Sequence, residues 1–146
     1  KHDEIIRTIA SKFREENFHQ NTTILFLKSR DSSNRVHDSA YTRKKGKGVD
    51  ISRLRHVLRV DEEECVVDAE PLVSMEQLVA ATLQHGLIPK VVPEFKTITV
   101  GGAVMGAALE SSSHAYGQFL DTCREVTVLL GNGDVVTCSR TDHADL

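Results

Sequence analysis

The 21-residue segment from Thr97 to Gly117 constrains the fold of this chain most, because it contains almost no bulky side chains. It reads TITVGGAVMGAALESSSHAYG, with four glycines set among alanines and serines. Glycine has no Cβ, so the peptide N–H groups of Gly101 and Gly102 can lie directly against a ligand. If a helix begins near Thr99, its first N–H groups and positive dipole end face the same ligand, which is a common way to hold phosphate or pyrophosphate. The alternative is a small-residue helix packed closely against a sheet.

The composition is that of one globular domain and excludes several other classes. The chain has 146 residues, 40% hydrophobic and 27% charged, which excludes collagen-like, low-complexity and disordered chains. No apolar run approaches the ~20 residues that a membrane helix needs. Three cysteines without CxxC spacing indicate neither a disulfide framework nor a zinc site. Because the chain begins at Lys1 without an initiator Met and stops directly after its last patterned segment, we expect it to be a piece of a longer protein.

Hydrophobic periodicity predicts a mixture of helices and hairpins, and hence an α+β domain rather than a doubly wound α/β domain. Ser74 and Gln77 form a capping box at the start of one predicted helix, and Gly86 is suited to the position after its end. The central Asn-Gly of the last hairpin is a strong turn signal. The predicted helices are Asp3–Asn17 and Met75–His85, and the predicted strands are Thr22–Lys28, Val49–Ile51, His56–Val60, Cys65–Ala69, Val126–Leu130 and Val135–Cys138.

Between the first strand and the first hairpin the chain is polar and basic. Residues Ser29 to Lys47 contain few apolar side chains and are predicted to form a long loop. From Lys28 to Arg59 there are ten Lys or Arg and three acidic residues, a local charge of +7 in a chain of net charge −3. Such a stretch can contact a membrane surface or nucleic acid. Tyr41 is its sole Phe, Tyr or Trp, so stacking on nucleic-acid bases is poorly supported. A solvated loop, or a positive charge that attracts the phosphates of a cofactor, is favoured.

Two other groups of residues have both a chemical and a structural interpretation. His114 follows three serines, but no acid lies at a diagnostic spacing, so a hydroxyl-rich turn is favoured over nucleophilic catalysis. The acids from Asp61 to Glu64 match no calcium-loop spacing, so an exposed turn is favoured. No catalytic residue and no metal site is predicted, and the GxGxxG and P-loop motifs are absent from the sequence.

The segment from Thr97 to Gly117 resembles the FAD-binding segment of the Delta(24)-sterol reductase (Diminuto) family. Its blocks TVGG, MG, ESSSH and YG stand in the same order as in that family. Three flanking segments are similar to family segments as well, Glu70–Met75 to EPLVTM, Leu87–Glu94 to a run ending in PVLPE, and Val128–Val136 to VLADGSFV. The resemblance extends from Val49 to Leu146. Its ESSSH block is specific, whereas TVGG is shared by the vanillyl-alcohol-oxidase (PCMH) type of FAD-binding domain.

This resemblance implies a truncated PCMH-type FAD-binding domain with two subdomains and FAD between them. Residues 1–54 would form a small parallel α/β subdomain, and residues 55–146 an incomplete antiparallel sheet flanked by helices. The first phosphate-side loop of the family contains Arg-Pro-Gly, whereas this chain has Arg30-Asp31-Ser32, so Arg30 and Ser32 are only secondary candidates for FAD contacts. The main implied contacts are Thr99, Val100, Gly101, Gly102, Ala103, Val104, Met105, Gly106, Ala107, Ala108, Leu109, Glu110, Ser111, Tyr116 and Gly117.

The resemblance also implies an FAD-dependent oxidoreductase of steroid biosynthesis that reduces a C=C bond of a sterol side chain with NADPH. FAD would be held non-covalently, because the first loop carries Ser32 and Ser33 at the usual attachment place and no Cys lies within Thr97–Gly117. The implied partners are a sterol-like hydrophobic small molecule and no nucleic acid. Membrane association would involve segments outside this chain. The family implies a place at the endoplasmic reticulum membrane, and the alternative is a cytoplasmic protein.

Two alternative functions remain open at this point. One is an FAD-dependent oxidase or dehydrogenase of the same fold that acts on an alcohol or a hydroxy acid. The other is a catalytically silent flavin-fold module used for interaction. Under each interpretation, the 146 residues alone are expected to be inactive.

Overall fold

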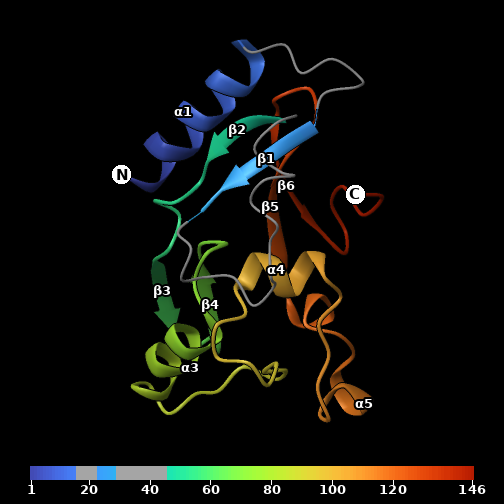
Figure 1. The fold of residues 1–146 in the computed structure, drawn as a ribbon. Coiled ribbons are helices and arrows are strands. Elements are labelled where there is room, and N and C mark those ends of the chain that lie inside the picture. Colours follow the sequence, from blue (N-terminus) through green and yellow to red (C-terminus); the bar gives the residue numbers. More distant parts are fainter. Residues whose placement is uncertain (16–22, 29–45) are drawn as a thin grey trace. The chain divides into compact units, whose positions relative to one another are not determined.

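The computed structural model describes residues 1–15, 23–28 and 46–146, which form two compact units. The first unit contains residues 1–15, 23–27, 46–53 and 123–146, and residues 54–122 form the bulk of the second. Helices occur together with a parallel strand pair and antiparallel hairpins, which confirms the predicted α+β class (Figure 1). The division into FAD-binding subdomains at residue 54 stays a prediction. Most of the predicted loop Ser29–Lys47, including Arg30 and Ser32, lies outside the described residues.

The first unit begins with helix α1 (His2–Glu15), which buries Ile5, Ala10 and Phe13 on one face. Strand β1 (Thr23–Leu27) pairs in parallel with strand β2 (Gly46–Asp50) (Figure 1). These elements confirm the predicted helix and strands, although β2 begins earlier than the predicted strand at Val49. The added residues are glycine and lysine, which carry no strand pattern, and they join the strand because β1 provides hydrogen-bonding partners for them.

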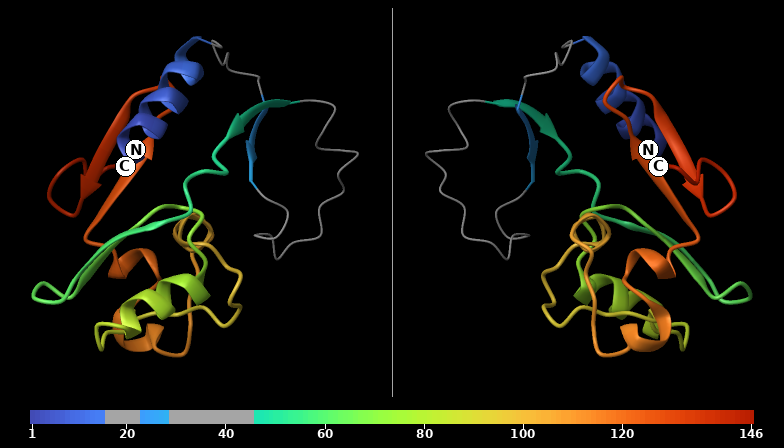
Figure 2. Two further views of the ribbon diagram at one scale, coloured as in Figure 1. Left: turned by 90° about the vertical axis from the view of Figure 1, so that its left-hand side faces the viewer. Right: turned by 90° about the vertical axis from the view of Figure 1, so that its right-hand side faces the viewer.

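A hairpin completes the first unit, formed by β5 (Glu125–Leu129) and β6 (Val135–Ser139). Its turn contains Gly133 at a φ of 88°, the left-handed conformation that the Asn-Gly signal predicts. Helix α1 lies beside this hairpin (Figure 2). Arg14, in the last turn of α1, lies 3.2 Å from the Asp134 carboxylate and ties the helix to the hairpin turn. The predicted hairpin is therefore confirmed, and a long-range ion pair supports its turn.

The second unit begins with a hairpin of β3 (Val57–Asp61) and β4 (Val66–Ala69), followed by helix α3 (Met75–Leu83). The predicted capping box at α3 is confirmed, because the Ser74 side chain accepts the Gln77 N–H and the Gln77 side chain accepts the Ser74 N–H. The helix ends before His85, because the N–H groups of Gln84, His85 and Leu87 all donate to the Thr82 carbonyl. Gly86 follows with a φ of 67°.

The rest of the second unit consists of short elements around a shared core. These are helix α4 (Val100–Met105), helix α5 (Ser113–Tyr116) and the 3-10 helix η2 (Leu120–Thr122). Ala103 of α4 is fully buried, so α4 lies on the core through its smallest side chains. The buried apolar residues of this unit are Leu54, Leu72, Val73, Met75, Leu78, Val91, Ala103 and Phe119.

Candidate functional site

The glycine-rich segment begins at a point where two helix starts are joined. Thr99 is the N-cap of α4, and its hydroxyl accepts the N–H of Gly102 at 3.2 Å. Ser74, the N-cap of α3, forms an isolated antiparallel bridge with Thr99. In this bridge Met75 donates its N–H to the Ile98 carbonyl at 2.8 Å. The start of α4 is therefore held by the segment that leads into α3, and the predicted helix start near Thr99 is confirmed.

The first N–H groups of α4 all have acceptors within the chain. Val100 donates to the Val73 carbonyl and Gly101 donates to the Pro71 carbonyl, both at 2.8 Å. A Cβ on Gly101 would lie 2.8 Å from the Pro71 Cβ, so this glycine allows close packing of two chain segments. A Cβ on Gly102 would meet only the Thr99 hydroxyl, at 3.0 Å. The sequence allowed either close packing or approach to a ligand, and the helix start combines the two. Gly101 serves packing, whereas Gly102 faces outward.

From the last residue of α4 onward the same segment becomes exposed. Met105 is 85% exposed and Leu109 is 64% exposed. Ala107 has a φ of 50°, in the left-handed region. Ala108 is tied inward, because its N–H donates to the Ala103 carbonyl at 3.0 Å and its carbonyl accepts the Phe119 N–H at 2.8 Å. The N–H groups of Ala107 and Leu109 have no acceptor within residues 46–146 or the other described ranges.

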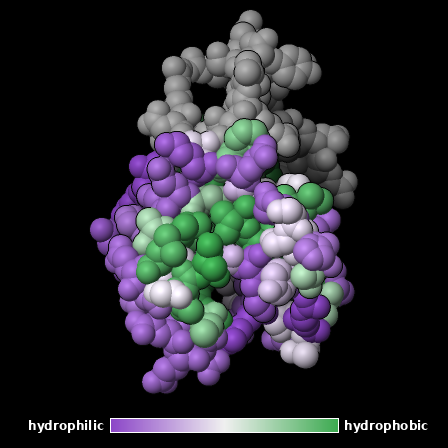
Figure 3. All heavy atoms as spheres, turned by 90° about the horizontal axis from the view of Figure 1, so that it is seen from below, coloured by the Kyte–Doolittle hydropathy of each residue, from purple (hydrophilic) through white to green (hydrophobic). Residues whose placement is uncertain are grey.

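Residues 105–109 therefore form an open strip with apolar side chains and with backbone donors that no described residue pairs. Several other large apolar side chains of the second unit are exposed too, and Figure 3 shows hydrophobic side chains gathered on one face. An apolar surface with a few backbone donors is the usual lining for a planar cofactor that carries ring carbonyl groups. The strip fits the ring system of FAD on this observation. The start of α4 fits the pyrophosphate less well, because its N–H donors are already used.

The ESSSH block forms a hydrogen-bonded turn. Glu110 accepts both the hydroxyl and the N–H of Ser111, and these contacts, the hydroxyl first, lower the pKa of the Glu110 carboxyl. The Ser113 hydroxyl accepts the Glu110 N–H at 3.0 Å. His114 places its Nδ1 2.7 Å from the Ser111 carbonyl and is exposed. The hydroxyl groups thus hold a turn, as the structural interpretation of the block expects.

The end of the segment depends on residues that the sequence analysis did not single out. Gly117 has a φ of 78°, and the Asp121 carboxylate occupies the space where its side chain would stand. The same carboxylate accepts the Gln118 N–H at 2.7 Å. Lys90 places its Nζ 5.7 Å from the centre of the half-exposed Tyr116 ring. No sequence signal identifies Lys90, whereas Asp is a common turn residue, which is a weak signal for Asp121.

The structure places the fifteen main predicted FAD contacts along one stretch of the second unit, from α4 through α5. Their contact with FAD stays a prediction. The secondary candidates Arg30 and Ser32 lie outside the described residues.

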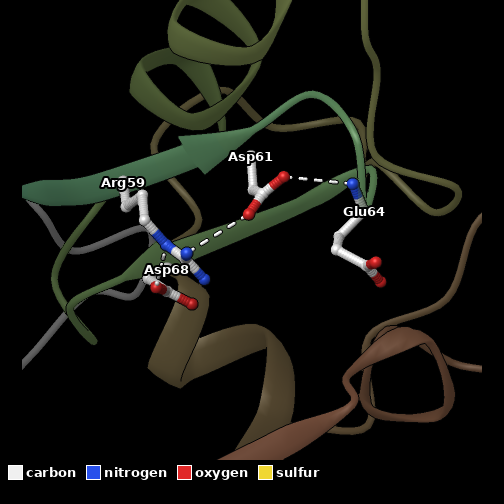
Figure 4. Close-up of polar contacts among 4 residues, drawn as sticks. All are labelled: Arg59, Asp61, Glu64 and Asp68. Atoms are coloured by element: carbon white, nitrogen blue, oxygen red, sulfur yellow. Dashed lines mark hydrogen bonds and ion pairs between the residues drawn. The ribbon is translucent and has the colours of Figure 1, made fainter.

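Asp61, at the acidic turn between β3 and β4, binds groups within the protein. Asp61 accepts from the Arg59 guanidinium at 3.2 Å and from the Glu64 N–H at 3.0 Å, and Arg59 also binds Asp68 at 3.0 Å (Figure 4). Among the described residues, no group of three or more His, Cys, Asp or Glu side chains is arranged to hold a metal ion. Across the same ranges, no helix has the length and apolar character needed to cross a membrane.

Comparisons with known proteins agree with this geometry. A family model described as an FAD binding domain matches residues 26–139. The Delta(24)-sterol reductase of Pisum sativum is 29% identical over 147 residues, covering 100% of this chain and 26% of the relative. The Delta(24)-sterol reductase of Rattus norvegicus is 41% identical over 93 residues, covering 64% of this chain and 18% of the relative. The chain thus spans about a quarter or less of the length of these relatives.

A solved structure confirms the fold. The crystal structure of 6-hydroxy-D-nicotine oxidase from Arthrobacter nicotinovorans superimposes with a TM-score of 0.66 at 16% identity, covering 95% of this chain and 28% of that chain. An identity this low is evidence about the fold alone. Together with the family match, it confirms the expected PCMH-type fold and the resemblance that predicted it.

Proposed function

The chain belongs to the family of FAD-binding domains, and we propose that it is the cofactor-binding portion of a flavin-dependent oxidoreductase that reduces a C=C bond of a sterol side chain. The observation that carries the proposal is the open strip of residues 105–109 within the family match. The similarity to two sterol reductases supports the sterol substrate. NADPH is the electron donor in this proposal, and the substrate is a sterol-like hydrophobic molecule.

Each part of the strip has a role in holding the cofactor. Met105 and Leu109 would lie against the flavin ring and exclude water from it, and the N–H groups of Ala107 and Leu109 would be free to donate to it. Gly102 lets the chain approach the phosphate side of the cofactor without a side chain between them. The bound FAD supplies the hydride-transfer chemistry, and the protein supplies position and electrostatics.

FAD is bound non-covalently in this proposal. The basis is the absence of Cys from Thr97–Gly117 and the presence of Ser32 and Ser33 in the first loop, as the sequence shows. Denaturation should therefore release all flavin into solution. Flavin fluorescence that stays with the polypeptide on a denaturing gel would contradict this and would direct attention to His114.

An oxidase or dehydrogenase of the same fold is the second candidate function. The likeness to 6-hydroxy-D-nicotine oxidase is compatible with it, because the fold alone does not distinguish an oxidase from a reductase. A catalytically silent flavin-fold module is the third candidate. Membrane association through segments outside this chain, and a place at the endoplasmic reticulum, belong to the sterol proposal only.

The test uses the protein produced at its natural length. Its absorbance spectrum should show flavin bands, and anaerobic NADPH should bleach them. A sterol with a side-chain double bond should then restore the oxidised spectrum and yield the saturated sterol. Bleaching by an alcohol or hydroxy acid, with reoxidation by O₂, would support the oxidase instead. A protein without flavin bands that also fails to bind added FAD would support the silent module.

A further inference from the structure

Glu70 is a buried carboxylate for which the proposed function has no role. Its side chain is 1% exposed, although it lies next to the segment that supports α4. Its Oε2 accepts the backbone N–H of His56 at 2.8 Å and lies 3.0 Å from His56 Nδ1. A carboxylate buried this deeply is costly unless its oxygens are hydrogen-bonded, so its position relative to His56 is closely determined.

Hydrogen bonds continue from Glu70 into the turn that follows it. The Glu70 N–H donates to the His56 carbonyl at 3.0 Å, and the Glu70 carbonyl accepts the Val73 N–H at 3.1 Å. Leu72 donates to the Leu54 carbonyl at 2.9 Å. The turn from Glu70 to Val73 is thus fixed on the strand side by His56 and Leu54.

The same turn presents two carbonyl groups to α4. Pro71 accepts the Gly101 N–H and Val73 accepts the Val100 N–H, both at 2.8 Å. The position of a Cβ on Gly101, 3.1 Å from the Pro71 carbonyl oxygen, shows that the two segments have almost no room to slide. A displacement of the turn must therefore displace the start of α4.

We propose that Glu70 is a positioning residue for cofactor binding, which sets the place of α4 by fixing the turn whose carbonyls hold Val100 and Gly101. This inference rests on the proposed function, because it assigns Glu70 an effect on FAD affinity without contact between Glu70 and FAD. Glu70 acts through Pro71 and Val73 in this account. The start of α4 then presents Gly102 and the strip of residues 105–109 in a fixed arrangement.

The experiment compares Glu70→Ala with Leu78→Ala in the protein produced at its natural length. Leu78 is buried in α3 and makes no hydrogen bond to the Glu70–Val73 turn, so its truncation controls for general destabilisation. At a temperature where both variants are folded, Glu70→Ala should raise the Kd for FAD at least roughly tenfold, and Leu78→Ala should change it less than about twofold. Equal effects of the two variants would overturn the proposal.

Hydrogen exchange of the apoprotein gives a readout that does not depend on FAD. The amides of Val100 and Gly101 should exchange at least roughly tenfold faster in Glu70→Ala, relative to the amides of α3, and should keep their relative rates in Leu78→Ala. Glu70→Gln keeps an acceptor for the His56 N–H and should restore most of the protection. If Glu70→Ala does not fold, His56→Ala tests the side-chain part of this link, because it removes the Nδ1 contact of an exposed side chain and keeps the backbone N–H contact. Unchanged relative protection of Val100 and Gly101 in His56→Ala and Glu70→Ala would overturn the proposal, whereas a wild-type protein that binds no FAD would overturn the proposed function alone.

Discussion

The two halves of the glycine-rich segment have similar composition and opposite surroundings. From Val100 to Ala103 the N–H groups are bonded within the protein, and Thr99 and Ala103 are buried. From Met105 to Leu109 two backbone donors have no acceptor among the described residues, and the large side chains point to the surface. The first half is thus a support that is built into the core, and the second half is the surface to which we propose that the cofactor binds. Small residues serve close packing in the one and access in the other.

The largest expected effect is a difference in stability and FAD binding between variants of the two adjacent glycines of the first half. Gly101→Val should destabilise the protein by about 3 kcal/mol, because its side chain collides with Pro71. Gly102→Val should cost less than about 1 kcal/mol, since its Cβ meets only the Thr99 hydroxyl, but it should abolish FAD binding. Denaturant unfolding and an FAD titration at natural chain length measure both. A Gly102→Val variant that keeps its flavin spectrum would remove Gly102 from the site.

A charge placed in the second half should affect binding rather than stability. Met105→Glu should leave the free energy of unfolding within about 0.5 kcal/mol of the wild type, because the side chain is exposed. It should weaken FAD binding at least roughly tenfold, since the cofactor would bury an unpaired carboxylate. Leu83→Glu, at an apolar side chain that is 57% exposed at the end of α3, is the matched control and should leave the affinity unchanged. Equal affinities of the two variants would show that the cofactor does not cover Met105.

The two joined helix caps offer a smaller test. Thr99→Ala and Ser74→Ala should each cost about 1 kcal/mol of stability, as loss of an N-cap usually does. Only Thr99→Ala should also weaken FAD binding, because it removes the cap that fixes the start of α4 and the position of Gly102. Thermal unfolding with and without FAD separates the two variants. A ligand-induced shift in Tm that falls equally in both would contradict the special role of the α4 start.

The smallest expected effect is a local pH dependence at Glu110, where the open half meets the ESSSH turn. The Ser111 contacts lower the pKa of this carboxyl below its ordinary value of 4.5, so they stabilise the turn above that pH. The stabilisation should be lost as the pH falls through the lowered pKa, and the Ser111 amide should then exchange faster. NMR titration of the Glu110 carboxyl, with Glu110→Gln as the control that removes the titration, measures this. A midpoint at or above 4.5 would contradict the Ser111 contacts.

Local signals in the sequence predicted most of the described elements. The capping box at Ser74, the hairpin turn at Gly133 and the apolar face of α1 all involve residues within a few positions of one another. Such interactions are visible in the sequence because the backbone itself brings their partners together. The limits of these elements were less predictable. The start of β2 and the end of α3 depend on hydrogen bonds to β1 and to Thr82 that periodicity does not record.

The sequence by itself determined the α+β class, the family resemblance and the segment in which the candidate site lies. It did not distinguish Gly101 from Gly102, or the packed half of that segment from the open half. Those differences come from partners far away in the chain, since Pro71 lies against Gly101, Lys90 against Tyr116, and Glu70 holds His56. Only the tertiary structure brings such residues together, and their contacts decide which backbone groups are used for packing and which stay open to a cofactor.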